Sequence, residues 1–354
     1  MKSVQIDQLY DDFSRVRVVD APIPEPADGQ VRVRMRMCPV NPSDRNFIHG
    51  DYRRALERLI WNRGQTQLCY DPARKQSLPN PPYALGGEGV GTVDACGSGL
   101  LARRLAGKRV AIAAGPPMGA WQEYTVVDAK KALPVPDALS DEQAAMYIVN
   151  PLSAYAMVHE VLSVKRGSWL LQDAAGSALA AMVIRMSKAH GFKTINVVRS
   201  SAHMQALESL GADVVINTES QDLIDEVAHA TGGRGVEYAM DCVGGELAGQ
   251  MLQCLTLNGH MVAFGTLADT PISLPSRDMM MPVTRLSGFF ALNWLAMQPP
   301  LKLLSVLRRL RKLAVKGVFD VPVRKTYPLD QVSEALTASV EPGQPGKVLL
   351  KIGT

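Results

Sequence analysis

Two short segments carry residue types that could bind a phosphorylated ligand. The first is a predicted strand–helix turn, Gln172-Asp-Ala-Ala-Gly-Ser-Ala-Leu-Ala180, in which small side chains surround Gly176. Small residues let the backbone N–H groups at a helix N-terminus approach a pyrophosphate, as they do in dinucleotide sites. The spacing departs from Gly-x-Gly-x-x-Gly, so the turn taken alone is also consistent with an ordinary strand–helix connection.

The second segment, Val197-Val-Arg-Ser-Ser201, lies where NAD-selective sites place an acidic residue for the ribose. Here Arg199, Ser200 and Ser201 offer guanidinium and hydroxyl donors, and no carboxylate is present to repel an anion. The pattern favours a 2′-phosphate, and therefore NADP(H) over NAD(H). The alternative is an arginine that simply ends a strand in solvent.

Motifs for other chemistries are missing from the sequence. There is no Cys-x-x-Cys, no His-Glu-x-x-His and no His-x-x-x-His, and the six histidines are dispersed. Gly97-Ser-Gly99 lacks the Gly-x-Ser-x-Gly context of a serine hydrolase. We therefore expect no metal site and no nucleophilic serine.

Composition limits the class of protein further. A chain of 354 residues suggests about two domains, and 47% hydrophobic with 20% charged residues is typical of a globular protein. The net charge of +4 (38 basic minus 34 acidic residues) is too small to indicate a nucleic-acid partner. Five cysteines without close pairs favour a reducing compartment, and no apolar run reaches about 18 residues. A cytoplasmic protein without a membrane partner is the default expectation.

The elements that position these segments change in character near residue 138. Before it, the alternation in Val31-Arg-Val-Arg-Met-Arg-Met37 and three further apolar stretches (86–93, 109–113, 123–127) predict a compact antiparallel barrel. A helix-like stretch from Ser140 to about Leu162 follows. Beyond it, strands are expected at 169–172, 194–198, 213–216, 236–241 and 260–264, with helices at 177–190, 202–210, 220–231 and 246–255. This alternation predicts an α/β fold with a parallel, doubly wound sheet.

Together these features resemble the medium-chain dehydrogenase/reductase superfamily. The resemblance implies a GroES-like β-barrel catalytic domain over residues 1–126 and 293–354, and a Rossmann NADP(H)-binding domain over 127–292. The zinc alcohol dehydrogenases of this superfamily have a cysteine and a histidine where this chain has Asn41 and Gly87. Their cysteine-rich lobe is missing too, so the resemblance is to a zinc-independent branch.

Within that branch the chain looks most like the mitochondrial-type 2-enoyl thioester reductases, with quinone oxidoreductases next. Three stretches carry the similarity: Asn41–Tyr52, Thr194–Arg199 and Gly288–Trp294. The resemblance implies that Tyr52 is the catalytic residue. It implies cofactor contacts at Asn150, Gly176, Ser177, Ala178, Leu179, Arg199, Ser200, Ser201, Phe264, Gly265, Thr266, Leu267, Phe289, Phe290, Ala291 and Lys347.

The implied activity is reduction of a conjugated C=C bond by NADPH, most simply in a 2-enoyl thioester, with Tyr52 donating a proton or holding the enolate. A small molecule or an acyl thioester would be the substrate, and the family implies a homodimer. Two alternatives stay open: a quinone or enone oxidoreductase, and a non-catalytic NADPH-binding protein. Tyr52 itself could instead be an interface residue.

Two departures from the family bear on the substrate and the cofactor. The family's Gly-Val-Gly at the helix start is Ala178-Leu-Ala180 here, which adds two methyl groups beside the pyrophosphate. An insert at about 53–82 follows Tyr52 and should reshape the substrate pocket. A predicted basic helix, Lys302–Lys316, could face the phosphates of coenzyme A or an acidic acyl carrier, or form a solvated face.

Overall fold

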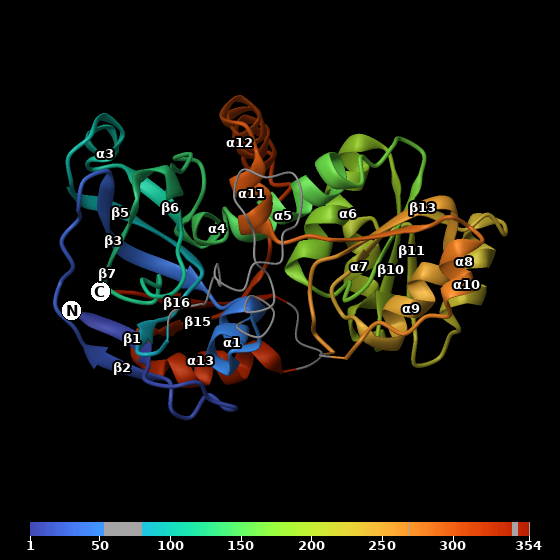
Figure 1. Cartoon of the computed structure of the whole chain (residues 1–354), viewed down its shortest axis with the longest axis horizontal. Coiled ribbons are helices and arrows are strands. Elements are labelled where there is room, and N and C mark those ends of the chain that lie inside the picture. The colour runs from blue at the N-terminus through green and yellow to red at the C-terminus, as the bar shows by residue number, and fades with distance from the viewer. Residues whose placement is uncertain (53–79, 269, 342–345, 354) are drawn as a thin grey trace, which may run out of the picture. The chain divides into compact units, whose positions relative to one another are not determined.

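The structure is a computed structural model that describes residues 1–52, 80–268, 270–341 and 346–353. Contacts divide the chain into two units, drawn in Figure 1. The first comprises Met1–Ile148, Val323–Pro342 and Lys347–Thr354, and the second is mainly Val149–Pro322. The predicted insert at 53–82 lies outside the described residues, apart from its last three.

The first unit is β-rich and mostly antiparallel, as predicted, but its strands form two sheets, and β15 and β16 pair in parallel. One has the strand order β2-β1-β4; the other has the order β15-β16-β3-β5-β6-β8, and β7 pairs with β3. The strands are β1 Lys2–Ile6, β2 Arg17–Asp20, β3 Gln30–Pro39, β4 Tyr83–Ala84, β5 Glu88–Cys96, β6 Arg109–Ala113, β7 Tyr124–Asp128, β8 Ala132–Pro134, β15 Val323–Pro328 and β16 Lys347–Lys351. The helices are α1 Pro42–His49, α3 Leu100–Leu105, α4 Asp141–Ala145 and α13 Val332–Val340.

Strand β3 organises the larger sheet, because it pairs with β5, β7 and β16. Its alternating pattern is confirmed: Val31, Val33 and Met35 are buried, and the arginines between them point outward. At Gly91 of β5 an added Cβ would lie 2.3 Å from the backbone oxygen of Arg34. The close approach of these two strands therefore requires a glycine.

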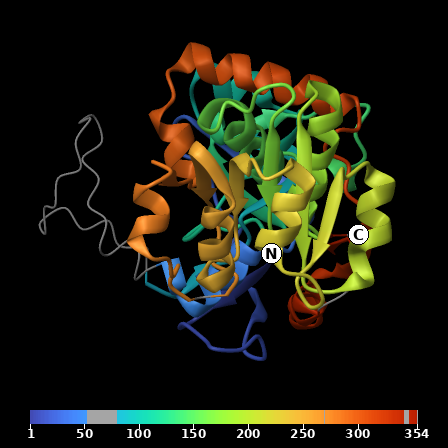
Figure 2. The ribbon, with the colours of Figure 1, turned by 90° about the vertical axis from the view of Figure 1, so that its right-hand side faces the viewer.

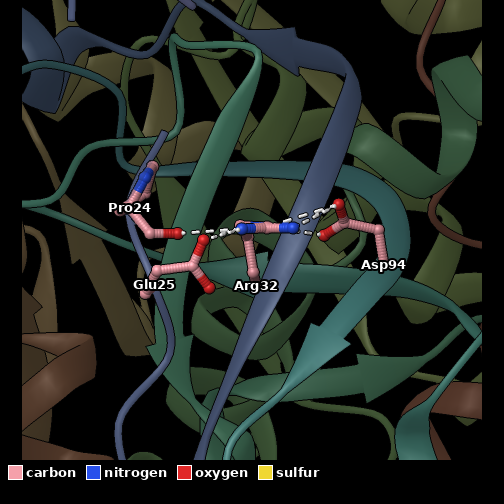
Figure 3. Close-up of polar contacts among 4 residues, drawn as sticks. All are labelled: Pro24, Glu25, Arg32 and Asp94. Carbon is pink, nitrogen blue, oxygen red and sulfur yellow. Dashed lines mark hydrogen bonds and ion pairs between the residues drawn. The ribbon is translucent and has the colours of Figure 1, made fainter. Parts of the chain in front are cut away.

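Arg32, on the outer face of β3, joins three segments of the first unit (Figure 3). Its guanidinium donates to both carboxylate oxygens of Asp94 and to Glu25 at 2.9 Å, and it reaches the backbone oxygen of Pro24 at 3.3 Å. The Arg32 side chain is 16% exposed and Asp94 is 29% exposed, so water screens this pair less than it screens a surface ion pair; Glu25, at 80%, is a surface partner and contributes less. It attaches the proline-rich segment before β3 to the sheet.

The second unit is a six-stranded parallel sheet with the order β11-β10-β9-β12-β13-β14. The strands are β9 Trp169–Gln172, β10 Lys193–Val198, β11 Val214–Asn217, β12 Val236–Asp241, β13 Leu255–Ala263 and β14 Arg285–Gly288. The helices are α5 Val149–Tyr155, α6 Ala178–His190, α7 Met204–Leu210, α8 Leu223–Thr231, α9 Gly245–Gln253, α10 Ser276–Met280, α11 Ala291–Met297 and α12 Pro300–Val315. Helices α6 and α7 flank one side of the sheet and α8, α9 and α10 the other (Figures 1 and 2). The predicted doubly wound α/β architecture is confirmed.

The boundaries between the units, after Ile148 and before Val323, lie later in the chain than the predicted boundaries after residues 126 and 292. Helix α4 packs against β3, β5 and β6, and therefore stays with the first unit. Helices α11 and α12 pack against α5, and therefore stay with the second.

The single helix expected from 140 to about 162 is wrong in one respect. The chain forms α4, then α5, and continues from α5 as a π-helix at Ala156–Val161. Pro151 lies in the first turn of α5, where its missing N–H is tolerated. In a continuous helix that N–H would have to donate to the carbonyl four residues earlier. The chain therefore ends α4 and starts α5 as a separate helix.

We predict that Arg32→Lys lowers the free energy of unfolding by about 0.5–1.5 kcal/mol, because lysine cannot reproduce the forked contact with Asp94. Chemical denaturation followed by circular dichroism measures this loss. Arg34→Lys is the matched control, since Arg34 is exposed on the same strand and makes no ion pair among the described residues. Equal stability of Arg32→Lys and the control would contradict the role of the network.

Candidate active site

The second unit has a topological switch point between β9 and β12. The chain continues from β9 to β10 on one side, whereas β12 joins β9 on the other, with Met240 opposite Gln172. In open parallel sheets a ligand binds beyond the carboxyl ends of the strands at such a point. The turns after β9 and β12 are therefore the expected walls of a dinucleotide site.

The turn after β9 leads into α6 as the sequence predicts. Ser177 caps the helix, with its hydroxyl accepting from the Ala180 N–H at 3.2 Å. The Ala175 N–H donates to the backbone oxygen of Val197 at 3.0 Å, which holds the turn against β10. Gly176 through Leu179 thus lie at the N-terminal end of a 13-residue helix, whose free N–H groups and dipole attract an anion.

The end of β10 brings its predicted anion-binding residues to the same edge of the sheet. Arg199 and Ser201 are exposed and Ser200 is half-buried. A short helical turn, Ser201–His203, follows. An added Cβ on Gly176 would lie 2.9 Å from the imidazole ring of His203, so the two predicted phosphate-binding segments meet at this ring.

His203 is a candidate site residue that the sequence analysis missed. It is one of six dispersed histidines, to none of which the sequence assigns a site. The available signal was its position, four residues after Arg199 and two residues after the segment 197–201 that was assigned to anion binding. Its contact with Gly176 depends on the fold and cannot be read from the spacing.

Backbone hydrogen bonds hold the predicted cofactor residues of the later strands at this edge. The N–H of Phe264 donates to the oxygen of Asp241 at 2.8 Å, and that of Leu267 to the oxygen of Cys242 at 3.0 Å. The N–H of Phe289 donates to the oxygen of Ala263 at 2.8 Å. The predicted residues Phe264, Gly265, Thr266, Leu267, Phe289, Phe290 and Ala291 therefore lie in the loops after β13 and β14 or at the start of α11. Asn150 lies on α5, the helix against which α11 packs.

The predicted catalytic residue, Tyr52, lies in the first unit just after α1. Its ring contacts Phe47 edge-on, with 5.2 Å between ring centroids, and its side chain is hydrogen-bonded to Asn46. Burial raises the pKa of the Tyr52 phenol above 10, and the nearby Asp44 charge adds to this effect. The Asn46 hydrogen bond opposes it. The hydroxyl is therefore protonated at neutral pH and can serve as a donor.

A buried polar cluster lies beside α1, and we define it as Asn41, Asp44, Glu88 and Lys347. The Asn41 amide donates to Glu88 Oε1 at 3.0 Å. The Asp44 carboxylate accepts from the backbone N–H of Asn41 and from that of Gly87, both at 2.8 Å. Strand β16 brings in Lys347, which is 8% exposed. Four polar side chains thus share the interior of the first unit.

Burial shifts the pKa of Asp44 and the pKa of Lys347 in opposite directions. It raises the pKa of Asp44 to about 7, although two N–H donors and Lys347 favour the carboxylate. It lowers the pKa of Lys347, and attraction to Glu88 and Asp44 opposes that change. Lys347 thus compensates buried carboxylates, a role the sequence did not predict. Its predicted contact with a cofactor stays a prediction.

The cluster does not fit a zinc site. Asn41 offers only an amide, and Gly87 offers no side chain at all. Within the ranges that the structure describes, no three His, Cys, Asp or Glu side chains gather as metal ligands would. Burial and the Asp44 and Glu88 charges also raise the pKa of the neighbouring Cys38 thiol, which disfavours the thiolate that binds metals.

Two family models match the chain. The alcohol dehydrogenase GroES-like domain matches residues 27–137, and the zinc-binding dehydrogenase model matches residues 178–305. They cover parts of the first and second units respectively.

Known proteins resemble the chain over nearly its whole length. The mitochondrial enoyl-[acyl-carrier-protein] reductase of Xenopus tropicalis is 30% identical, over 92% of this chain and 88% of its own. The human protein of that name is 29% identical, over 90% and 80%. A Bacillus thuringiensis protein assigned as an NADPH:quinone reductase is 30% identical, with a TM-score of 0.85 over 99% and 98% of the two chains. The Escherichia coli quinone oxidoreductase, solved with NADPH, has the same fold at 24% identity, with a TM-score of 0.83 over 99% and 100%.

None of the described helices combines the length and the apolar composition needed to cross a membrane.

We predict that Lys347→Met lowers the free energy of unfolding by about 3–5 kcal/mol, because it leaves buried carboxylates without their cation. Thermal and chemical denaturation measure the loss. The double variant Lys347→Met, Glu88→Gln removes one of the uncompensated charges and should regain part of the stability. A single variant as stable as the wild type would show that Lys347 does not compensate the cluster.

Proposed function

Since this chain belongs to the medium-chain dehydrogenase/reductase superfamily, in its zinc-independent branch, we propose that it is an NADPH-dependent reductase of conjugated carbon–carbon double bonds. Members of this superfamily are NAD(P)-dependent oxidoreductases. The substrate class that we propose is a 2-enoyl thioester. Support comes from the relatives named enoyl-[acyl-carrier-protein] reductase, which align with about nine-tenths of the chain.

One observation carries the choice of substrate class: a half-buried tyrosine that stays protonated next to an amide donor. The Asn46 side chain donates to the Tyr52 oxygen, while burial disfavours the phenolate. A phenol in this state can donate a hydrogen bond to an oxygen that becomes negative during the reaction. A fixed donor of this kind is typically worth about 2.7–4 kcal/mol of barrier lowering.

The cofactor would supply hydride to the β-carbon of the substrate. Negative charge then develops on the carbonyl oxygen and the α-carbon, and Tyr52 stabilises it by its hydrogen bond or by proton transfer. Gly176 through Leu179 would hold the pyrophosphate through backbone N–H groups. Arg199, Ser200 and Ser201 would hold the 2′-phosphate, and His203 lies where its ring would join them.

A quinone or enone oxidoreductase is the second candidate, and one observation favours it. The Bacillus thuringiensis protein assigned as an NADPH:quinone reductase is as similar in sequence as the enoyl reductases are. Such an enzyme needs the same cofactor residues but no tyrosine acid. A non-catalytic NADPH-binding protein would retain the cofactor site and turn over neither substrate.

We also propose a homodimer joined along β14, the outer strand of the six-stranded sheet. Three apolar residues on or just before this strand are exposed: Met281, Val283 and Leu286, by 78%, 58% and 38%. A second copy could pair with this edge and cover them. A cytoplasmic location stays a prediction, and the enoyl reductases above are named as mitochondrial.

The cofactor proposal predicts that Arg199→Ala weakens NADPH binding by about 10–100-fold, because a charged hydrogen bond to the 2′-phosphate is lost. NADH binding should change by less than about twofold. Fluorescence titration with both nucleotides measures this. Arg277→Ala, at an exposed residue of α10, controls for the general loss of positive charge. Equal weakening of NADPH and NADH would contradict the role of Arg199.

The substrate proposal predicts that Tyr52→Phe lowers kcat for a 2-enoyl thioester by about 100–1000-fold. The phenyl ring keeps the packing against Phe47, so NADPH affinity should not change. Steady-state assays with enoyl thioesters, enones and quinones test this, with Tyr124→Phe on β7 as the control. Unchanged turnover of a good enoyl thioester would reject the tyrosine acid, and rapid quinone reduction by the variant would favour the second candidate.

A further inference from the structure

Two buried aspartates, Asp173 and Asp241, lie at the switch point of the parallel sheet. Asp173 directly follows β9 and is 3% exposed, and Asp241 is the last residue of β12 and is 0% exposed. These two strands flank the switch point. The backbone N–H of Val243 lies within hydrogen-bond distance of both carboxyl groups, 3.2 Å from Asp173 Oδ2 and 3.1 Å from Asp241 Oδ1. A single donor shared in this way requires the two acids to be close neighbours.

Backbone donors satisfy three of the four carboxyl oxygens. The Cys242 N–H donates to Asp173 Oδ1 at 2.9 Å, and the Gly244 N–H to Asp241 Oδ1 at 2.8 Å. Asp241 Oδ2 is buried and has no hydrogen-bond partner in the described part of the chain. A buried acceptor without a donor is destabilising, because it has given up its hydrogen bonds to water and gained none in return. A proton held between the two carboxyl groups would supply the missing donor, as it does in other acid pairs.

The surroundings also favour a retained proton. The ionisable groups that act most strongly on Asp173 are Asp241, on β12, and the thiol of Cys242, in the turn that follows; neither is a cation. Burial, together with Asp241, raises the pKa of the Asp173 carboxyl well above its usual range. Burial and the two acids likewise raise the pKa of Cys242, so its thiol stays neutral.

The position of the pair connects it to the proposed cofactor site. Asp173 is the first residue of the turn that leads to the N-terminus of α6, where the pyrophosphate would bind. The backbone oxygen of Asp241 accepts from Phe264, the first residue of the predicted cofactor loop after β13. A change in the charge of the pair therefore acts, across the turn that Asp173 begins, on an anionic ligand at the N-terminus of α6.

We propose that the Asp173–Asp241 pair is a proton-binding site that couples protonation to dinucleotide binding. With one shared proton the pair carries one negative charge, and the pyrophosphate is tolerated. Loss of that proton adds a second buried charge, which repels the pyrophosphate. By linkage, binding of the dinucleotide at alkaline pH returns the proton: a hydrogen ion leaves the buffer and an O–H bond forms on the pair. This inference rests on the proposed NADPH binding.

Calorimetric titration in buffers of different ionisation enthalpy counts the protons taken up on binding. When NADH or NADPH binds above neutral pH, the wild type should take up protons from the buffer. Its affinity for either nucleotide should fall about tenfold between about pH 7 and about pH 9.5. NADH is included because it lacks the 2′-phosphate of NADPH, a group that binds and releases protons itself and would add to the count. Asp241→Asn replaces the unpartnered oxygen with an amide that donates to Asp173. This variant should show no proton uptake with NADH and a flat affinity profile.

Asp222→Asn is the matched control, since Asp222 is an exposed N-cap of α8 and asparagine caps equally well. It should behave as the wild type does. Asp173→Asn provides a second test if Asp241→Asn does not fold. Absence of proton uptake by the wild type, or equal uptake by the wild type and a folded pair variant, overturns the coupling and leaves the aspartates as a structural clamp. Failure of the wild type to bind either nucleotide would instead overturn the proposed cofactor, and the coupling with it.

Discussion

All six strands of the second unit run in the same direction, so their carboxyl ends meet along one edge of the sheet. Every feature of the candidate cofactor site follows from this constraint. The turn after β9, the end of β10 and the loops after β12 and β13 come from distant parts of the chain, yet backbone hydrogen bonds link them in pairs. The sheet thus builds an anion-binding surface mainly from N–H groups, with few charged side chains.

The first unit meets a different physical demand, because it places acids and a base in its interior. Asp44 accepts two backbone N–H groups and thereby joins the start of α1 to the segment before β5. Lys347 arrives on β16 and partly neutralises the acids. A cluster of this kind stabilises the fold only while it is complete, since a lone buried charge costs more than the pair contributes. The rigid support of α1, and hence of Tyr52, depends on it.

The sequence predicted the elements well wherever local pattern decides the structure. The alternation in β3 and the strand–helix succession from Trp169 onward depend on neighbours in the chain, and both are confirmed. Contacts between distant residues could not be predicted in this way. Asp173 and Asp241 meet only because β9 and β12 are adjacent, and His203 covers Gly176 only because a helical turn follows β10. The burial of Lys347 likewise depends on the pairing of β16 with β3.

That pairing has a consequence for how the polypeptide assembles. Strand β16 lies between β15 and β3, so the sheet that begins near the N-terminus is completed by residues synthesised after the whole second unit. During translation the parallel sheet has all its strands available first, and it can fold while the β3 edge that awaits β16 is still open. An open edge invites wrong pairing with other chains. A nascent chain that stops before residue 347 therefore leaves Met37–Pro39 of β3 without the strand that pairs with them.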